Sequence, residues 1–119
     1  MTRHFDSAHF LRGYQGKCEA LHGHRYQVKL TVASDRLNDI GLAFDFTELK
    51  KELDGVIEKY DHHLLNDVPP FDTINPSAEN ISQTIYKELK LKMEAATVAI
   101  TEVEVWESPD SSATYVPDA

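Results

Sequence analysis

Three histidines, His9, His22 and His24, are the side chains of this sequence best suited to binding a metal ion. Side chains alternate between the two faces of a strand, so His22 and His24, which flank Gly23, point to the same side of an extended segment. A single core-facing histidine is more often a packed residue than a ligand, but three that converge reverse that preference. Three imidazoles beside an open position are the usual arrangement of catalytic zinc. The pattern therefore predicts a metal site, with zinc favoured over iron or copper and another divalent metal left as an open alternative.

Cys18 is the only cysteine of the chain and lies four residues before His22. Its neighbours Gly16, Lys17 and Glu19 make this segment too polar for a cysteine that merely fills a core. A thiol close to a cation or an imidazole can lose its proton near neutral pH and then act as a base or nucleophile. A single cysteine also excludes an intrachain disulfide and a thiolate-rich structural zinc site.

Acidic residues and a fourth histidine add further candidates. Asp61 precedes His62, and a carboxylate beside an imidazole is what a proton relay needs, whereas His63 is interpreted as a solvated side chain. Glu107 stands at the end of a predicted strand, where on its own it would be an ordinary exposed carboxylate. Glu79 lies in the first turn of a predicted helix, where its negative charge complements the positive end of the helix dipole. Asp61, His62 and Glu107 gain a chemical role only if the fold brings them to a site.

Two strands are predicted to position the histidines. Residues 2–11 alternate, with His9 on the core side, and the glycine-containing residues 12–21 form a loop to the second strand. Pairing of the two strands would place His9 beside the other two histidines. The second strand carries its apolar side chains on the face that His22 and His24 continue, namely at Tyr26, Val28, Leu30 and Val32.

Two amphipathic helices are predicted next. Asp45 and Glu48 have the spacing of a capping box, and apolar side chains then recur at helical intervals. Residues 61–75 contain two consecutive prolines and are predicted to form a long polar loop. A second helix follows this loop, capped by Asn75 or Ser77. The apolar stripes are Phe46, Leu49, Leu53, Val56, Ile57 and Tyr60 in the first helix, and Ala78, Ile81, Ile85, Leu89 and Met93 in the second.

After residue 97, apolar and polar residues alternate again, which predicts a third strand that ends at Glu107. Residues 112–116 are predicted to form a fourth strand. The order strand, strand, helix, helix, strand, strand indicates the α+β class. We expect one two-layer domain over residues 1–119, in which two helices cover one face of a four-stranded antiparallel sheet. The other face is expected to be covered by other subunits and to carry Phe10, Val98, Ile100 and Trp106.

The composition excludes several classes of function. At 119 residues, with 41% hydrophobic and 27% charged residues, the chain fits one soluble globular domain. Its formal net charge of -8 argues against nonspecific nucleic-acid binding, which needs a basic surface. No apolar leader or membrane-length segment is apparent, so we expect a cytoplasmic protein. An anionic substrate would need local basic groups, for which Arg12, Lys17 and Arg25 are candidates.

The candidate residues belong to an ordered set of motifs, namely Phe5-Asp6-Ser7-Ala8-His9, Cys18-x-x-x-His22-Gly23-His24, Phe44-Asp45-Phe46, Asp61-His62-x-x-Leu65-Asn66, Asn75-Pro76-Ser77-Ala78-Glu79-Asn80 and Trp106-Glu107. Taken together, these motifs resemble the family of 6-pyruvoyl-tetrahydropterin synthases and 6-carboxy-tetrahydropterin synthases. The resemblance covers nearly the whole chain, and the ordered set is far more specific than any single motif. The short gap between Cys18 and His22 resembles the 6-carboxy-tetrahydropterin synthase branch of the bacterial queuosine pathway.

The resemblance implies a tunnelling fold, in which trimers close their sheets into a barrel, two trimers stack into a hexamer and the active site lies at a subunit interface. It implies the substrate 7,8-dihydroneopterin triphosphate, whose side chain is shortened to a carboxylate with loss of acetaldehyde and triphosphate, without a redox cofactor. The implied roles are zinc binding by His9, His22 and His24, acid/base catalysis by Cys18, a relay by Asp61 and His62, and anchoring of the pterin by Glu107.

Two alternatives stay open. A 6-pyruvoyl-tetrahydropterin synthase, or another enzyme that modifies the pterin side chain, would use the same site and form a different product. A paralogue that binds pterin or metal without catalysis would not need Cys18, Asp61 and His62 together. Because only four residues precede Phe5, the first strand is expected to be shorter than is usual in the family.

Overall fold

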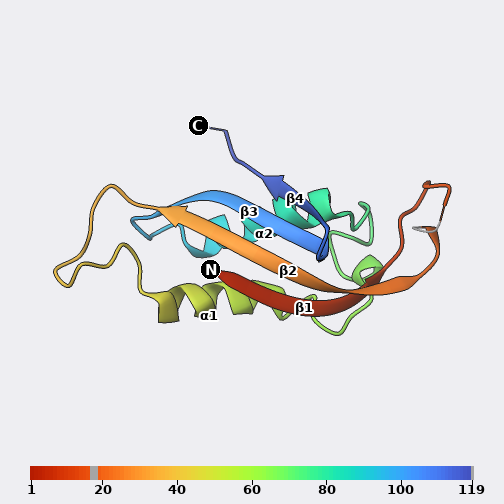
Figure 1. Cartoon of the computed structure of the whole chain (residues 1–119), viewed down its shortest axis with the longest axis horizontal. Coiled ribbons are helices and arrows are strands. Elements are labelled where there is room, and N and C mark those ends of the chain that lie inside the picture. Colours follow the sequence, from red (N-terminus) through yellow and green to blue (C-terminus); the bar gives the residue numbers. More distant parts are fainter. Residues whose placement is uncertain (17–18, 119) are drawn as a thin grey trace.

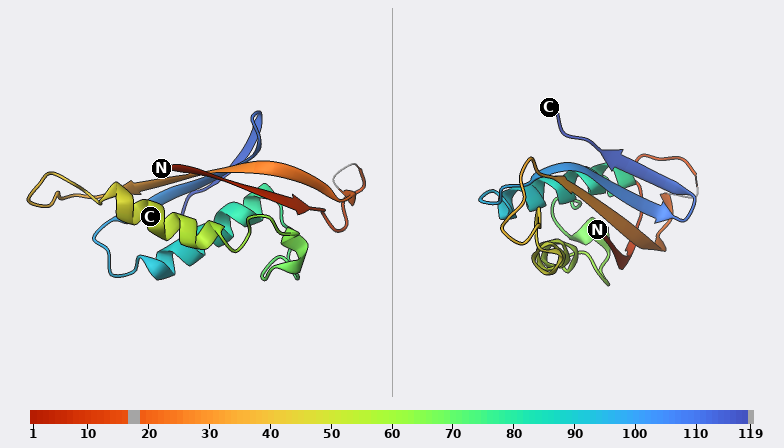
Figure 2. Two further views of the ribbon diagram at one scale, coloured as in Figure 1. Left: turned by 90° about the horizontal axis from the view of Figure 1, so that it is seen from below. Right: turned by 60° about the vertical axis from the view of Figure 1, so that its left-hand side comes forward.

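The computed structural model describes residues 1–16 and 19–118 of the chain. Four strands form one antiparallel sheet in the order β1-β2-β3-β4, and both helices lie on one of its faces (Figure 1, Figure 2). The predicted two-layer α+β arrangement is therefore confirmed. The elements are β1 (Thr2–His9), β2 (His22–Ala33), α1 (Phe46–Ile57), the 3-10 helix η2 (Leu65–Asp67), α2 (Ala78–Lys92), β3 (Ala99–Ser108) and β4 (Ser111–Tyr115).

The core lies between the sheet and the helices. Tyr26, Val28 and Leu30 of β2 are buried, as the period of two predicts, and so are all five apolar residues of the predicted α2 stripe. The prediction for α1 is wrong at Phe46, which is 79% exposed. Phe46 occupies the first turn of α1, which extends past the start of β1 (Figure 1), so the buried stripe begins one turn later at Leu49.

Both helices begin at capping residues. The Asp45 carboxylate accepts a hydrogen bond from the backbone N–H of Thr47 at 2.8 Å, so the predicted cap is confirmed although its donor lies one residue before Glu48. At α2 the cap is Ser77, whose hydroxyl accepts from the N–H of Asn80 at 3.1 Å. These caps fix where each helix starts relative to the sheet.

A β-bulge corrects the prediction for the beginning of β3. The register shifts so that Ile100, instead of Thr101, stands opposite Val32 of β2. One extra residue reverses the alternation, and Val98 and Ile100 consequently pack against the helix-covered core instead of the opposite face. The sequence pattern did not reveal this bulge because Thr101 suits a strand as well as its neighbours do.

The prediction that residues 61–75 form a purely polar loop is wrong, because this segment contains a short helix and buried apolar side chains. It contains η2, and both Leu65 and Phe71 are completely buried. Its first residues run alongside the outer edge of β1, where the His62 N–H donates to the carbonyl of Asp6 at 2.6 Å and the Ala8 N–H donates to the carbonyl of His63 at 3.1 Å. The segment therefore closes part of the sheet edge and contributes to the core.

No helix in residues 1–16 and 19–118 is both long and apolar enough to cross a membrane.

Two fully buried tyrosines provide a matched test of hydrogen bonding in this core. The Tyr60 hydroxyl donates to Glu88 at 2.6 Å, whereas the Tyr26 hydroxyl has no partner among the described residues. Burial raises the pKa of both phenols, so both are neutral. We expect Tyr60→Phe to lower the free energy of unfolding by about 1.5–3 kcal/mol, because the hydrogen bond to a charged group is lost.

Tyr26→Phe removes only a polar atom that has no partner among the described residues, so the free energy of unfolding should stay constant or rise by up to about 1–3 kcal/mol. Urea unfolding of the two single variants, each in the metal-free protein, measures both effects against the wild-type chain. A loss of stability in Tyr26→Phe as large as that in Tyr60→Phe would show that the Tyr26 hydroxyl has a partner in solution.

Candidate active site

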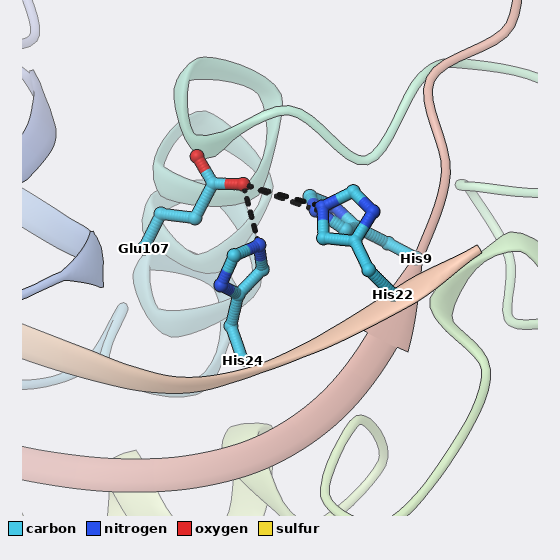
Figure 3. A group of neighbouring side chains, drawn as sticks. All are labelled: His9, His22, His24 and Glu107. Atoms are coloured by element: carbon cyan, nitrogen blue, oxygen red, sulfur yellow. Dashed lines mark hydrogen bonds and ion pairs between the residues drawn. The ribbon is translucent and has the colours of Figure 1, made fainter. Parts of the chain in front are cut away.

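The three predicted histidine ligands meet at one end of the sheet. His9 ends β1, His22 and His24 begin β2, and the register pairs His9 with His22. Their Nε2 atoms point to a common position, with His9 Nε2 and His22 Nε2 3.0 Å apart (Figure 3). Glu107 of β3 reaches the same position, its Oε1 lying 3.1 Å from His9 Nε2 and 2.9 Å from His24 Nε2. One donor atom from each of the four residues lies within 4.8 Å of the others.

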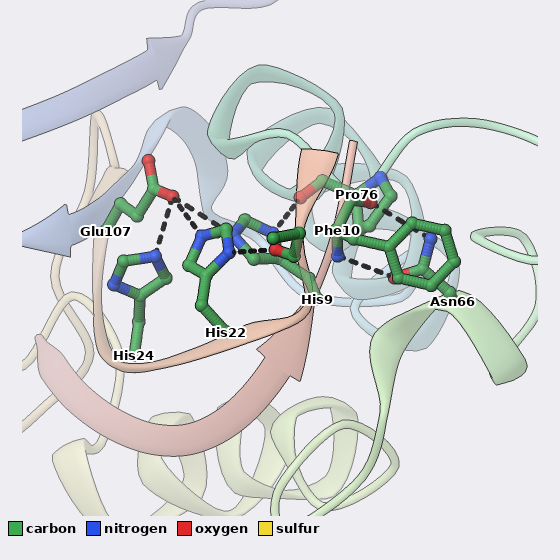
Figure 4. Close-up of polar contacts among 8 residues, drawn as sticks. His9, Phe10, His22, His24, Asn66, Pro76 and Glu107 are labelled. Carbon is green, nitrogen blue, oxygen red and sulfur yellow. Dashed lines mark hydrogen bonds and ion pairs between the residues drawn. The ribbon is translucent and has the colours of Figure 1, made fainter. Parts of the chain in front are cut away.

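Backbone carbonyls orient two of the imidazoles (Figure 4). His9 Nδ1 lies 2.7 Å from the carbonyl oxygen of Pro76, and His22 Nδ1 lies 2.6 Å from that of Ala20. A carbonyl can only accept, so this hydrogen-bond network assigns the proton to Nδ1 and leaves a lone pair on each Nε2. Second-sphere hydrogen bonds of this kind hold metal-ligating histidines in position.

The donor atoms fit a metal ion. Two Nε2 lone pairs at 3.0 Å cannot hydrogen-bond to each other, and a cation between them removes their repulsion. Among the described residues, the buried His24 Nε2 has no aligned hydrogen-bond partner, despite its short distance to Glu107. Burial lowers the pKa of His24, opposed by the Glu107 carboxylate, and so favours the neutral imidazole that a metal binds. The site predicted at the three histidines is therefore chemically suited to a divalent metal.

Two asparagines, whose roles the sequence analysis did not identify, fix the chain directly after His9. The side-chain amide of Asn66 accepts from the N–H of Phe10 and donates to its carbonyl, each at 3.0 Å. Asn75 makes the same pair of hydrogen bonds with the backbone of Arg12, each at 2.9 Å. Both asparagines stand in the recognised motifs, but only the fold brings them to backbone groups more than fifty residues away.

Arg12 is a poor candidate for holding an anionic substrate. Its guanidinium donates to the carbonyl of Phe71 at 2.9 Å, with longer bonds to the carbonyls of Ile74 and Asn66 at 3.3 and 3.4 Å. These contacts use the side chain to hold the loop after β1. Lys17 lies outside the described residues, and Arg25 remains available because it lines the cavity beside the histidines.

The predicted relay residues form a separate group in the single chain. Asp61 Oδ1 accepts from the N–H of Asp6 at 2.9 Å and lies 3.0 Å from His62 Nδ1. These interactions, the Asp6 N–H first, lower the pKa of Asp61 and keep it ionised. His62 is exposed and has a φ of 58°, a conformation uncommon outside glycine. The pair clusters with Asp6 instead of the histidines, and Cys18 lies outside the described residues.

A cavity of about 620 Å³ opens next to the metal-binding group. His24 and Glu107 line it together with Trp106, and Arg25 and Gln27 line it from the face of β2 opposite His24. This volume is in the range of small-molecule sites. A cavity lined by one imidazole and the carboxylate of the metal-binding group is suited to a small polar heterocycle beside a metal.

The fold and the metal-binding group together define a class of protein. The family model described as 6-pyruvoyl tetrahydropterin synthase matches residues 1–118, and this chain belongs to that family. The structure of the Caenorhabditis elegans 6-pyruvoyl tetrahydropterin synthase superposes with a TM-score of 0.88 at 27% identity, covering 99% of this chain and 93% of that one. The predicted tunnelling fold is thereby confirmed.

Within the family, curated relatives point to one branch. The chain is 37% identical to the 6-carboxy-5,6,7,8-tetrahydropterin synthase of Bacillus subtilis, over 96% of this chain and 81% of that protein. It is also 37% identical to the protein of the same name from Synechocystis sp., over 93% of this chain and 86% of the relative. The predicted resemblance to tetrahydropterin synthases is confirmed.

Proposed function

We propose that the chain is a zinc-dependent 6-carboxy-5,6,7,8-tetrahydropterin synthase, a lyase of queuosine biosynthesis. It would convert 7,8-dihydroneopterin triphosphate and water to 6-carboxy-tetrahydropterin, with release of acetaldehyde and triphosphate. The observation that carries the proposal is the convergence of the three histidine Nε2 atoms beside Glu107 and the cavity. The relatives at 37% identity support the choice of product. A cytoplasmic homohexamer, or a trimer, completes the proposal.

His9, His22 and His24 would hold the zinc ion, which supplies Lewis acidity for oxygen atoms of the pterin side chain that develop negative charge. Glu107 would orient the pterin, because a carboxylate can accept two parallel hydrogen bonds from a ring N–H and the 2-amino group. Arg25, at the edge of the same cavity, is the best placed described cation for the triphosphate.

Proton transfer is assigned to Cys18, with Asp61 and His62 as its relay. The ionised Asp61 is 3.0 Å from His62 and can stabilise the charged imidazole. Since this pair does not cluster with His9, His22 and His24 within one chain, we place it at a subunit interface, where it would serve the site of a neighbouring copy. This arrangement agrees with the interface location that the family resemblance implies.

Product analysis tests the proposal. Zinc-loaded protein is incubated with 7,8-dihydroneopterin triphosphate, and the pterins are identified by mass spectrometry. A 6-carboxy-tetrahydropterin product with acetaldehyde is the expected result. A 6-pyruvoyl product would instead indicate the activity named by the family model and by the C. elegans structure, which is the second candidate. Bound but unchanged substrate would indicate a non-catalytic paralogue.

A further inference from the structure

The Glu107 carboxylate lies where a fourth metal ligand would stand. In a tetrahedral zinc site with bonds of about 2.0–2.1 Å, neighbouring donor atoms are roughly 3.3 Å apart. Glu107 Oε1 is 3.1, 2.9 and 4.0 Å from the Nε2 atoms of His9, His24 and His22, values that bracket this spacing (Figure 3). Three imidazoles and this oxygen would therefore close the coordination of a metal ion.

A closed site conflicts with catalysis, because catalytic zinc keeps one position open for water or substrate. Glu107 must leave that position if a substrate oxygen is to take it. The cavity beside the cluster is lined by both Glu107 and His24, so the carboxylate has space to turn into without disturbing the core.

The backbone at Glu107 is suited to such a movement. Trp106 pairs with Ser112 of β4 and Ser108 pairs with Ser111, so Glu107 is an extra residue at a bulge. The last pair between β2 and β3 joins Gln27 to Trp106, which leaves Glu107 outside that ladder as well. Bulges occur next to active sites, where they redirect a side chain. The side chain is also 29% exposed, in contrast to the completely buried valines that precede it on β3.

We infer that Glu107 is an exchangeable ligand: it closes the metal site when no pterin is bound and turns into the cavity to bind the pterin when substrate arrives. The inference rests on the proposed function and adds a coupling between the two ligands of the site. Metal and pterin both compete for the Glu107 carboxylate, and such coupling is reciprocal. Bound pterin therefore lowers the affinity for the metal by the same factor as bound metal lowers the affinity for pterin. Release of product would let the carboxylate close the site again.

Cobalt(II) in place of zinc, with 7,8-dihydropterin as the probe, tests the exchange. This pterin lacks the hydroxylated side chain that could ligate the metal, so a change in the visible cobalt spectrum reports the departure of Glu107. Pterin binding is followed separately by calorimetry, and metal affinity by competition with a chelator.

For the wild-type protein we expect 7,8-dihydropterin to change the cobalt spectrum. Glu107→Gln should lower metal affinity by roughly 10–100-fold, at least the cost of losing an outer-sphere partner of a metal-ligating histidine, and should bind the probe more weakly. The matched control is Glu102→Gln, on the same strand but opposite Thr31 and outside the metal-binding group, which should change neither property.

The outcomes separate the two proposals. Unchanged metal affinity in Glu107→Gln overturns the ligand role, and calorimetric binding of the pterin without a change in the wild-type spectrum overturns the exchange. In both cases the proposed function still stands. Glu107 would be only a pterin anchor in the first case and only a metal ligand in the second. A wild-type protein that binds metal but no pterin overturns the proposed function together with the exchange.

Discussion

Replacing His24 with alanine is expected to lower zinc affinity by more than about 100-fold and to abolish turnover. Loss of an outer-sphere partner of a metal site alone costs roughly 10–100-fold in affinity, and His24 would be a direct ligand. Its Nε2 is a buried atom without an aligned hydrogen bond to any described residue, and it lies only 2.9 Å from the Glu107 oxygen. The side chain is 23% exposed, so its removal should leave the core intact.

Zinc content after gel filtration, together with competition by a chelator, measures the effect of His24→Ala. His63→Ala provides the control, since His63 is exposed, donates to the carbonyl of Asp61 and lies outside the metal-binding group. Retention of zinc at wild-type affinity in His24→Ala would refute the assignment of the three histidines as the metal site.

Cys18→Ala is expected to reduce turnover by about 10²–10⁴-fold, the usual contribution of a positioned acid/base, while zinc remains bound. Among the described residues, three imidazoles and one carboxylate already supply four donor atoms to the metal-binding group, so zinc binding and turnover should separate. Initial rates of product formation and zinc content, measured on the same preparation, provide the test. The matched control is Gln15→Ala on the same loop.

Cys18→Ser extends the test of Cys18 chemically. A hydroxyl is a much weaker acid than a thiol, so serine should restore little activity even though it keeps the size of the side chain. Full activity in the alanine variant would refute the acid/base role of Cys18. Proton transfer would then be assigned to Asp61 and His62 alone.

The sequence predicted the histidine site because its determinants are local. Alternation along β1 and β2 decides which way His9, His22 and His24 point, and antiparallel pairing needs only the short connection between the strands. The partners that orient the imidazoles were not predictable in this way. Pro76 is 67 residues from His9, and a backbone carbonyl has no side-chain signature in the sequence.

The errors in the predicted fold have physical reasons of the same kind. Helical spacing places Phe46 on the α1 stripe, but it cannot tell where along the helix the sheet begins. Alternation places Ile100 on the outer face until the bulge at Thr101 reverses it. The pattern and the single chain relate Asp61 only to the histidines of its own copy, whereas the proposed interface site would pair it with the histidines of a neighbouring copy.

The segment along β1 links the proposed chemistry to the behaviour of the protein in solution. The Asp61 carboxylate accepts from the N–H of Asp6, and the N–H of His62 donates to the carbonyl of Asp6, so the proposed relay pair also satisfies backbone groups of an edge strand. Exposed edge groups are templates for the addition of strands from other chains. A substitution that releases Asp61 would therefore raise the tendency to aggregate as well as slow proton transfer, and light scattering would separate these two causes of lost activity.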